Sequence, residues 1–253
     1  MRRLKKINFI CFVVFIFLTS SFVYVTQKMS MSSLHEKPWH LLPSVHEDSL
    51  SQYYKACYTI FDKKQMALQY TDSVQKLVLI LVDSWGVPVQ ENLLQEDFAS
   101  FEEIPHLYAL HQRLANRSKH AEMVEYRNVP IPNVYLFGGD SLEYNRKHYL
   151  NELNVETMKF CQHCDDSTML VMLGSLLQVD SLKSIMWTTQ SSRTGDRKLL
   201  HKSLKEIADL AKQHPNILFI IQGLHRPILG TPETRNMYKS HWVPVVILNG
   251  RES

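Results

Sequence analysis

The chain has 253 residues, of which 45% are hydrophobic, and a formal net charge of only +3. Arginines and lysines among the first six residues supply much of that charge, so the remainder is close to neutral and gives no electrostatic basis for binding nucleic acid. The length beyond the N-terminal segment, about 225 residues, is sufficient for one α/β domain with a substantial core.

The N-terminal segment 1–28 has the pattern of a membrane anchor. The basic start M-R-R-L-K-K precedes residues 7–25, which contain no charged side chain and have nearly the length of roughly 20 residues that spans a bilayer as a helix. The basic end predicts a cytoplasmic N-terminus, with the main domain on the periplasmic or extracellular side. A cleaved secretory signal is the alternative, although the small-residue A-x-A cleavage pattern is missing.

A polar and aromatic stretch, residues 29–70, follows the anchor and predicts a stalk with a short helix near 48–61. The main domain is expected over 71–253. It begins with Leu77–Val82 (LVLILV), whose apolar side chains without polar alternation predict a strand buried on both faces. That strand runs into the polar turn Asp83-Ser84-Trp85-Gly86.

Strands and helices then alternate along the chain. The patterns predict helices over 104–116, 167–179 and 198–214, and strands over 133–137, 183–188, 217–221 and 242–248. This alternation indicates βαβ units and therefore a mainly parallel sheet flanked by helices.

Cys161 and Cys164 have the C-x-x-C spacing that redox sites and zinc sites share. A structural zinc site needs four ligands, and the chain has only one such pair. Outside the cytoplasm, a local disulfide or two buried thiols are favoured instead.

Three polar residues lie at the ends of strongly apolar strands: Asp83, His225 and His241. Because ligands of α/β sheets bind at the carboxyl edge, we expect these side-chain tips to lie within about 10 Å of each other at that edge. One carboxylate and two imidazoles suit zinc, manganese or iron better than calcium or magnesium. The alternatives are that Asp83 caps a helix and that each histidine only forms hydrogen bonds.

The order of these segments resembles that of the alkaline phosphatase superfamily, which includes sulfatases, cofactor-independent phosphoglycerate mutases and membrane phosphoethanolamine or phosphoglycerol transferases. The opening LVLILVDSWGVP is similar to the first strand of that family and its metal-binding Asp, and the mutases have Asp-Gly-Trp-Gly where this chain has Asp83-Ser84-Trp85-Gly86. The segment 104–110 is similar to the Thr-Pro-Asn-Leu segment of sulfatases. The segments 198–225 and 240–247 resemble the long helix, strand and Gly-Asp-His, and the closing His-x-x-x-Pro strand.

The resemblance implies a three-layer α/β sandwich that uses a divalent metal, zinc or manganese, to hydrolyse or transfer a phosphoester or sulfoester. The substrate is then a small molecule or a lipid or glycan ester. In the matching positions, the implied metal ligands are Asp83, His225 and His241. The family's usual Thr, Ser or Cys nucleophile has no clear counterpart, and Ser141, at the end of a predicted strand and after two glycines, is the best placed residue for that role. Asp140 is a candidate further ligand, and Ser84 and Arg226 are candidate substrate-binding residues.

Two departures from the family pattern keep other functions open. Leu224 stands where the family has a ligand Asp before its His, and the chain is short for the superfamily. The second hypothesis is therefore a non-catalytic, membrane-anchored binding or assembly protein on the same fold. A third follows from Gly139-Asp140-Ser141-Leu142, which resembles the Gly-Asp-Ser-Leu turn of a class of serine esterases, although that motif normally opens its domain.

Overall fold

The computed structural model describes residues 50–61, 76–113, 164–189, 195–227 and 231–249, together with the backbone of the strands 134–138 and 156–161. All of them belong to one compact unit, Asp48–Ser253. The predicted anchor at 1–28 lies outside these residues and stays a prediction. Among the helices that are described, none combines the length and the apolar character needed to cross a bilayer.

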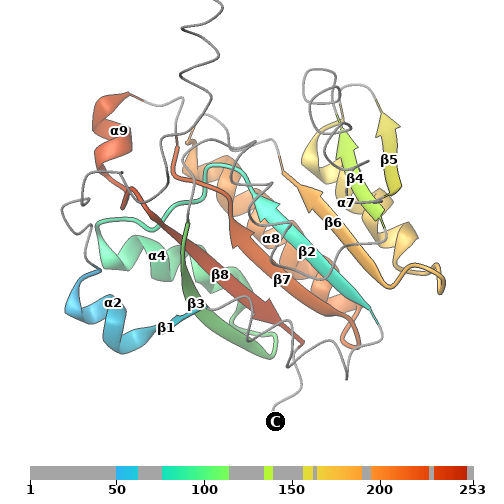
Figure 1. Cartoon of the computed structure of the whole chain (residues 1–253), viewed down its shortest axis with the longest axis horizontal. Helices are drawn as coiled ribbons and strands as arrows, with labels where there is room; N and C mark the ends of the chain where they lie inside the picture. The colour runs from blue at the N-terminus through green and yellow to red at the C-terminus, as the bar shows by residue number, and fades with distance from the viewer. Residues whose placement is uncertain are drawn as a thin grey trace, which may run out of the picture. The chain divides into compact units, whose positions relative to one another are not determined.

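The described strands form one sheet in the order β1-β3-β8-β7-β2-β6-β4-β5 (Figure 1). Each strand except β8 runs in the same direction, whereas β8 is antiparallel to both of its neighbours, β3 and β7. The prediction of a mainly parallel sheet is therefore confirmed. The strands are β1 (Thr59–Ile60), β2 (Leu77–Val82), β3 (His106–Gln112), β4 (Val134–Gly138), β5 (Glu156–Cys161), β6 (Ser184–Thr188), β7 (Leu218–Gly223) and β8 (Trp242–Leu248).

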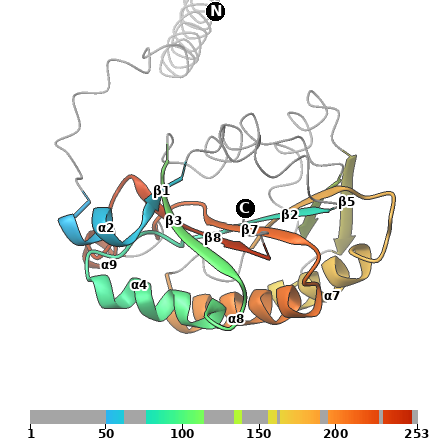
Figure 2. The ribbon, with the colours of Figure 1, turned by 90° about the horizontal axis from the view of Figure 1, so that it is seen from below.

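The three long described helices, α4, α7 and α8, cover the same face of the sheet (Figure 2). Their apolar sides pack on this face, and α8 buries Leu200, Leu204 and Ile207 at helical spacing. This accounts for one helical layer; the second layer of a three-layer sandwich stays a prediction. The described helices are α2 (Gln52–Cys57), α4 (Glu91–Phe98), the 3₁₀ turn η2 (Ala99–Phe101), α7 (Asp166–Leu176), α8 (Arg197–Gln213) and α9 (Pro232–Asn236).

The predicted helix over 104–116 is wrong, because its central residues form strand β3. Their leucines have helical spacing, yet Leu107 is exposed and Leu110 is buried. The backbone of β3 instead pairs with β8 from His106 to Gln112, so tertiary pairing overrides the local pattern. The helix near 48–61 is also shorter than predicted, and Thr59–Ile60 join the sheet beside β3.

The turns after β2 and β7 press against each other, backbone to backbone. A Cβ atom added to Gly223 would lie 1.9 Å from the carbonyl oxygen of Trp85, and one added to Gly86 would lie 2.8 Å from the Cα atom of Arg226. Such approaches exclude any side chain at these two positions. The contact fixes the spacing between the two turns that carry Asp83 and His225.

A buried carboxylate, Asp97 on α4, holds the turn after β2 through a hydrogen bond with Trp85. It accepts hydrogen bonds from the indole Nε1 of Trp85 at 3.1 Å, from the Nη2 atom of Arg197 at 2.8 Å and from the Nε2 atom of His201 at 2.8 Å. Since Asp97 is fully buried, these partners stabilise a charge that would otherwise be costly to remove from water. The turn after β2 is thereby joined to both α4 and α8.

Gly223→Ala is expected to lower the free energy of unfolding by about 3 kcal/mol, because the new methyl group must displace backbone atoms of the Trp85 turn. The control is Gly174→Ala in α7, where the closest atom is the flexible Cδ1 of Leu210 at 3.3 Å and alanine gains up to about 1 kcal/mol in helix propensity. Urea denaturation measures both variants. Equal stability of the two variants would show that the turns do not pack as described.

Asp97→Asn is expected to cost about 3 kcal/mol, because the guanidinium of Arg197 loses its buried partner charge and the hydrogen bond with His201 is weakened. The matched control is Glu103→Gln, which breaks the exposed 2.6 Å ion pair with Lys212 and should leave the denaturation midpoint almost unchanged. Thermal and urea denaturation give both values, and an Asp97→Asn variant as stable as the control would contradict the anchoring role.

Candidate functional site

Two of the predicted ligands, Asp83 and His225, meet at the carboxyl edge of the sheet. They follow the adjacent parallel strands β2 and β7, and the Nε2 atom of His225 lies 3.0 Å from the Oδ1 atom of Asp83. Both residues are almost completely buried. The register of the two strands, together with the packing of the turns that follow them, accounts for this contact.

The imidazole of His225 is oriented by acceptors on both sides. Its Nδ1 atom lies 2.8 Å from the carbonyl oxygen of Arg226, and its Nε2 atom faces the Asp83 carboxylate. A neutral imidazole has only one N–H group, so it satisfies one of these acceptors and leaves a lone pair on the other nitrogen. When Nδ1 carries the proton, the Nε2 lone pair faces the Asp83 carboxylate, and a divalent cation bound there would be shared by the two donors. Metal-binding histidines in proteins commonly have this Nδ1–carbonyl contact.

The turn that carries Asp83 is held in a backbone conformation that side chains disfavour. Ser84 has a φ of 59°, in the left-handed region, which costs a residue with a Cβ about 1 kcal/mol. The backbone N–H of Asp83 donates to Thr189 Oγ1 at 3.0 Å, and Ser84 Oγ lies 3.4 Å from Asp83 Oδ1. Strain of this kind persists where the surrounding structure over-determines the backbone, and such positions are common in functional sites.

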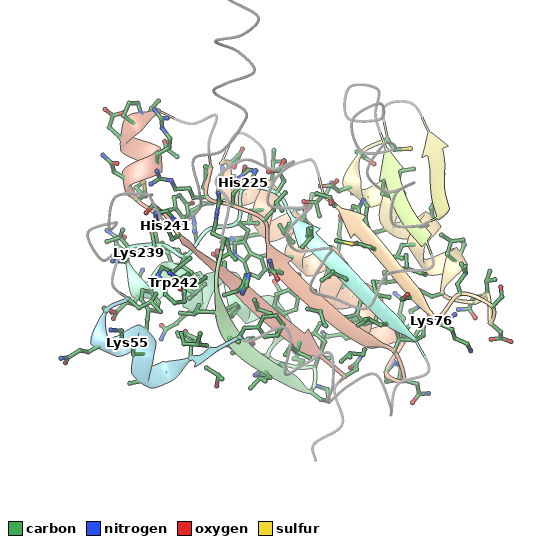
Figure 3. All side chains as sticks on the ribbon, in the orientation of Figure 1. Lys55, Lys76, His225, Lys239, His241 and Trp242 are labelled. Atoms are coloured by element: carbon green, nitrogen blue, oxygen red, sulfur yellow. The ribbon has the colours of Figure 1, made fainter. Side chains whose placement is uncertain are left out.

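His241 lies at the same edge of the sheet. Because β8 is reversed, its start at Trp242 rather than its end reaches this edge, and Figure 3 shows His225 and His241 there, with Lys76 at the opposite edge. The carbonyl oxygen of His241 accepts a 2.9 Å hydrogen bond from the backbone N–H of Arg113. All three residues lie at the predicted edge, and Asp83 and His225 are within the expected distance. The expected proximity of the His241 side chain and its role as a ligand stay predictions.

The segment between β7 and β8 is also bound to the chain that follows the Asp83 turn. The backbone N–H groups of Val87 and Val89 donate to the carbonyl oxygens of Trp242 and Met237, and that of Lys239 donates back to Val87. Backbone hydrogen bonds, as well as side-chain contacts, therefore hold together the segments that follow β2 and β7 at this edge of the sheet.

Asp140 and Ser141 lie outside the described residues, so their predicted roles as ligand and nucleophile remain predictions. Within the part of the chain that is described, no group of three or more His, Cys, Asp or Glu residues is arranged to hold a metal ion. The donors of Asp83 and His225 fit zinc or manganese in their chemistry, but a catalytic zinc site commonly has three protein ligands, so these two donors alone do not complete such a site.

Three further residues that stood out in the sequence lie in the described part of the chain: Arg226, Leu224 and Cys164. Arg226 is half-buried, and its Nη1 atom donates to the carbonyl oxygen of Arg235 at 3.3 Å. Leu224, at the position where the sequence resemblance leads one to expect an acidic ligand, is buried, and its backbone N–H donates to the carbonyl oxygen of Val82. Cys164 is disulfide-bonded and so is not a metal ligand, whereas Cys57 is free and exposed.

Sequence analysis missed Arg113, because its segment was predicted to be helical. It follows directly after β3 at the carboxyl edge and is 4% exposed. Burial, and secondly the charge of Arg226, lower the pKa of Arg113 to about 10. Reading 106–112 as a strand would have placed this cation at the edge that carries the other site residues.

No family model matches the sequence. No curated protein matches it either. Among solved structures, the lipoteichoic acid synthase LtaP from Listeria monocytogenes is similar, with a TM-score of 0.51 and 9% sequence identity over 72% of this chain and 67% of that chain. The phosphoglycerol transferase GacH from Streptococcus pyogenes, in complex with sn-glycerol-1-phosphate, gives a TM-score of 0.46 and 12% identity over 74% of this chain and 73% of that chain. At 9% identity the likeness to LtaP concerns the fold alone, and the chain shares the α/β fold of that structure.

Proposed function

We propose that this chain is a membrane-anchored, exported and metal-dependent enzyme that transfers or hydrolyses a phosphoester or sulfoester. The observation that carries the proposal is the buried contact of 3.0 Å between Asp83 and His225, at the carboxyl edge of a sheet with the alkaline phosphatase-like fold. A carboxylate and an imidazole are two of the ligands that a metal site needs, and the imidazole of His225 is oriented through its second nitrogen by the Arg226 carbonyl.

In the proposed site, Asp83 and His225 hold zinc or manganese, with His241 and Asp140 as further ligands. When bound, the ion lowers the pKa of a hydroxyl group or water and neutralises charge on the substrate oxygens. The chain's own contribution is to orient the donors: the Arg226 carbonyl fixes the His225 ring, and Thr189 fixes the backbone of Asp83.

Ser141 is the proposed nucleophile. Its Oγ atom forms a bond to the phosphorus or sulfur atom while the ester oxygen leaves with a proton as the free alcohol. Water or an acceptor alcohol then attacks the seryl ester, which releases Ser141 and gives hydrolysis or transfer. Ser84 and Arg226 would contact the substrate oxygens.

The proposed setting is a membrane surface outside the cytoplasm. The anchor predicted at 1–28 supports it, and so does the disulfide bond of Cys164, because disulfides persist in oxidising compartments. The lipoteichoic acid synthase of the same fold motivates a lipid- or glycan-linked ester as the substrate class.

The second candidate is a non-catalytic binding or assembly protein on this fold. The buried Leu224 favours it, since an apolar side chain occupies the position of an acidic ligand. A site with fewer carboxylates binds a second ion poorly, so we expect at most one tightly bound divalent ion.

Asp83→Asn and His225→Gln are each expected to weaken metal binding by at least about tenfold and to abolish turnover of phosphoester substrates. Ser141→Ala should abolish turnover and leave the metal content unchanged. The matched control is His106→Gln, since the Nδ1 atom of His106 also contacts a backbone carbonyl, that of Ile104 at 2.7 Å, but at the opposite edge of the sheet. Metal content by mass spectrometry and hydrolysis of aryl phosphates measure the two effects.

Metal content near zero in wild-type protein purified without chelator, together with unchanged behaviour of Ser141→Ala, would contradict the enzymatic proposal. That result would favour the binding role.

A further inference from the structure

Two exposed apolar side chains, Val89 and Met237, lie close to the candidate site. Val89 follows the Asp83 turn, and Met237 lies between His225 and His241 in the sequence. We infer that this apolar pair is a membrane-contacting surface, which holds the candidate site against the bilayer that carries the chain's own anchor. The inference deepens the proposed function and rests on its membrane-anchored setting, not on its chemistry.

The two side chains lie next to each other on a short antiparallel pairing. Pro88 pairs with Tyr238, and the backbone N–H of Val89 donates to the carbonyl oxygen of Met237 at 2.7 Å. This register places Val89 directly opposite Met237, and side chains of directly opposite residues share a face, with Cβ atoms about 5 Å apart. Val89 is 49% exposed and Met237 is 45% exposed, so together they form one apolar patch.

The backbone under the apolar pair is firmly held. Tyr238 is buried, and the buried hydroxyl group of Tyr54 on α2 donates to the carbonyl oxygen of Pro88 at 2.8 Å. The backbone N–H of Lys239 donates to the carbonyl oxygen of Val87 on the other side of the pairing. The apolar pair is therefore fixed at the surface, and contact with an apolar environment outside the domain would remove it from water.

The place where the chain enters the domain identifies the bilayer as that environment. Residues 29–49 connect the predicted anchor to the first described residue. Ser51 Oγ then donates to Glu91 Oε1 at 2.7 Å, and α2, which follows, is bonded to Pro88. Both views show α2 and α9 at the same end of the domain (Figures 1 and 2). The connection to the membrane and the apolar pair are thus found at the same place, beside segment 88–91.

The contact is apolar rather than electrostatic. The exposed charges of α9, Glu233 and Arg235, have opposite signs and cancel. Met237 has a flexible and polarisable side chain that adapts to an irregular apolar surface. Apolar side chains of membrane-surface proteins are buried about 5–10 Å into the boundary between headgroups and acyl chains. A site held at this depth favours an ester of a membrane lipid or of a lipid-linked glycan over a soluble metabolite.

The test measures lipid contact with nitroxide spin labels on the full-length protein in nanodiscs of phosphatidylcholine and phosphatidylglycerol. Labels are placed at Met237→Cys and, separately, at Val89→Cys. The control label is Val171→Cys on α7, because Val171 is an apolar residue that is 72% exposed. Collisions of each label with oxygen, which concentrates in lipid, are compared with collisions with a nickel chelate, which stays in water.

The labelled variants carry Cys11→Ser and Cys57→Ser and are handled without reductant. Cys57 is a free, exposed thiol that would react with the label, whereas Cys164 is disulfide-bonded.

We expect the oxygen-to-nickel collision ratio to be at least about fivefold higher at Met237 and Val89 than at Val171, because the apolar pair lies in the bilayer interface. Val89→Glu should lower the ratio of the Met237 label to that of the Val171 label, whereas Val171→Glu should leave it unchanged. High salt should change the ratio by less than about twofold, since salt screens charges and not apolar burial. If Val89→Glu lowers the melting temperature, the comparison of the three labels decides alone.

Equal ratios at the three positions overturn the inference. So does a Met237 label that is shielded from oxygen as well as from nickel, which would report contact with protein rather than lipid. Alkaline extraction that removes the chain from lipid vesicles overturns the inference together with the anchored setting. The proposed chemistry fails separately, when Asp83→Asn and His225→Gln leave metal content and turnover unchanged.

Discussion

The close contact between Gly223 and the carbonyl group of Trp85 is the constraint on which the site depends. Parallel pairing of β2 and β7 brings their ends together, but pairing alone leaves the turns that follow free to diverge. A side chain at Gly223 would force the turns apart. Because neither turn can shift, the Asp83 carboxylate and the His225 ring remain at hydrogen-bonding distance.

A second level of support comes from the helical face of the sheet. Asp97 holds the Trp85 indole, and the same carboxylate is neutralised by Arg197 on α8. The left-handed backbone of Ser84 directly precedes Trp85, whose carbonyl group packs on Gly223 and whose indole is held by Asp97. Packing outside the site therefore stabilises the strained backbone of Ser84. This is common where a backbone must hold a functional side chain in a fixed position.

The sequence was sufficient to predict the central strands, because long runs of apolar residues such as Leu77–Val82 are diagnostic of strands buried on both faces. It also predicted α8, whose buried positions repeat at helical spacing, and the edge at which Asp83 and His225 meet. It failed at β3, where helical spacing of leucines competed with a pairing partner, β8, more than a hundred residues later in the chain. No local pattern reports such a partner, and the same error concealed Arg113. The glycine contact was equally invisible, since it depends on two backbones that are far apart in sequence.

The reversed direction of β8 has a consequence for the way the site opens. His225 and His241 lie at the two ends of the segment that connects β7 to β8. Backbone groups of Met237, Lys239 and Trp242, in and next to this segment, form hydrogen bonds with Val87 and Val89, just beyond the Asp83 turn. Local unfolding of either strand end therefore breaks the hydrogen bonds of the other. The backbone amide protons of 87–89 and 237–242 should therefore exchange with solvent as one cooperative unit. The candidate ligands Asp83, His225 and His241 would then lose their fixed positions together rather than one at a time.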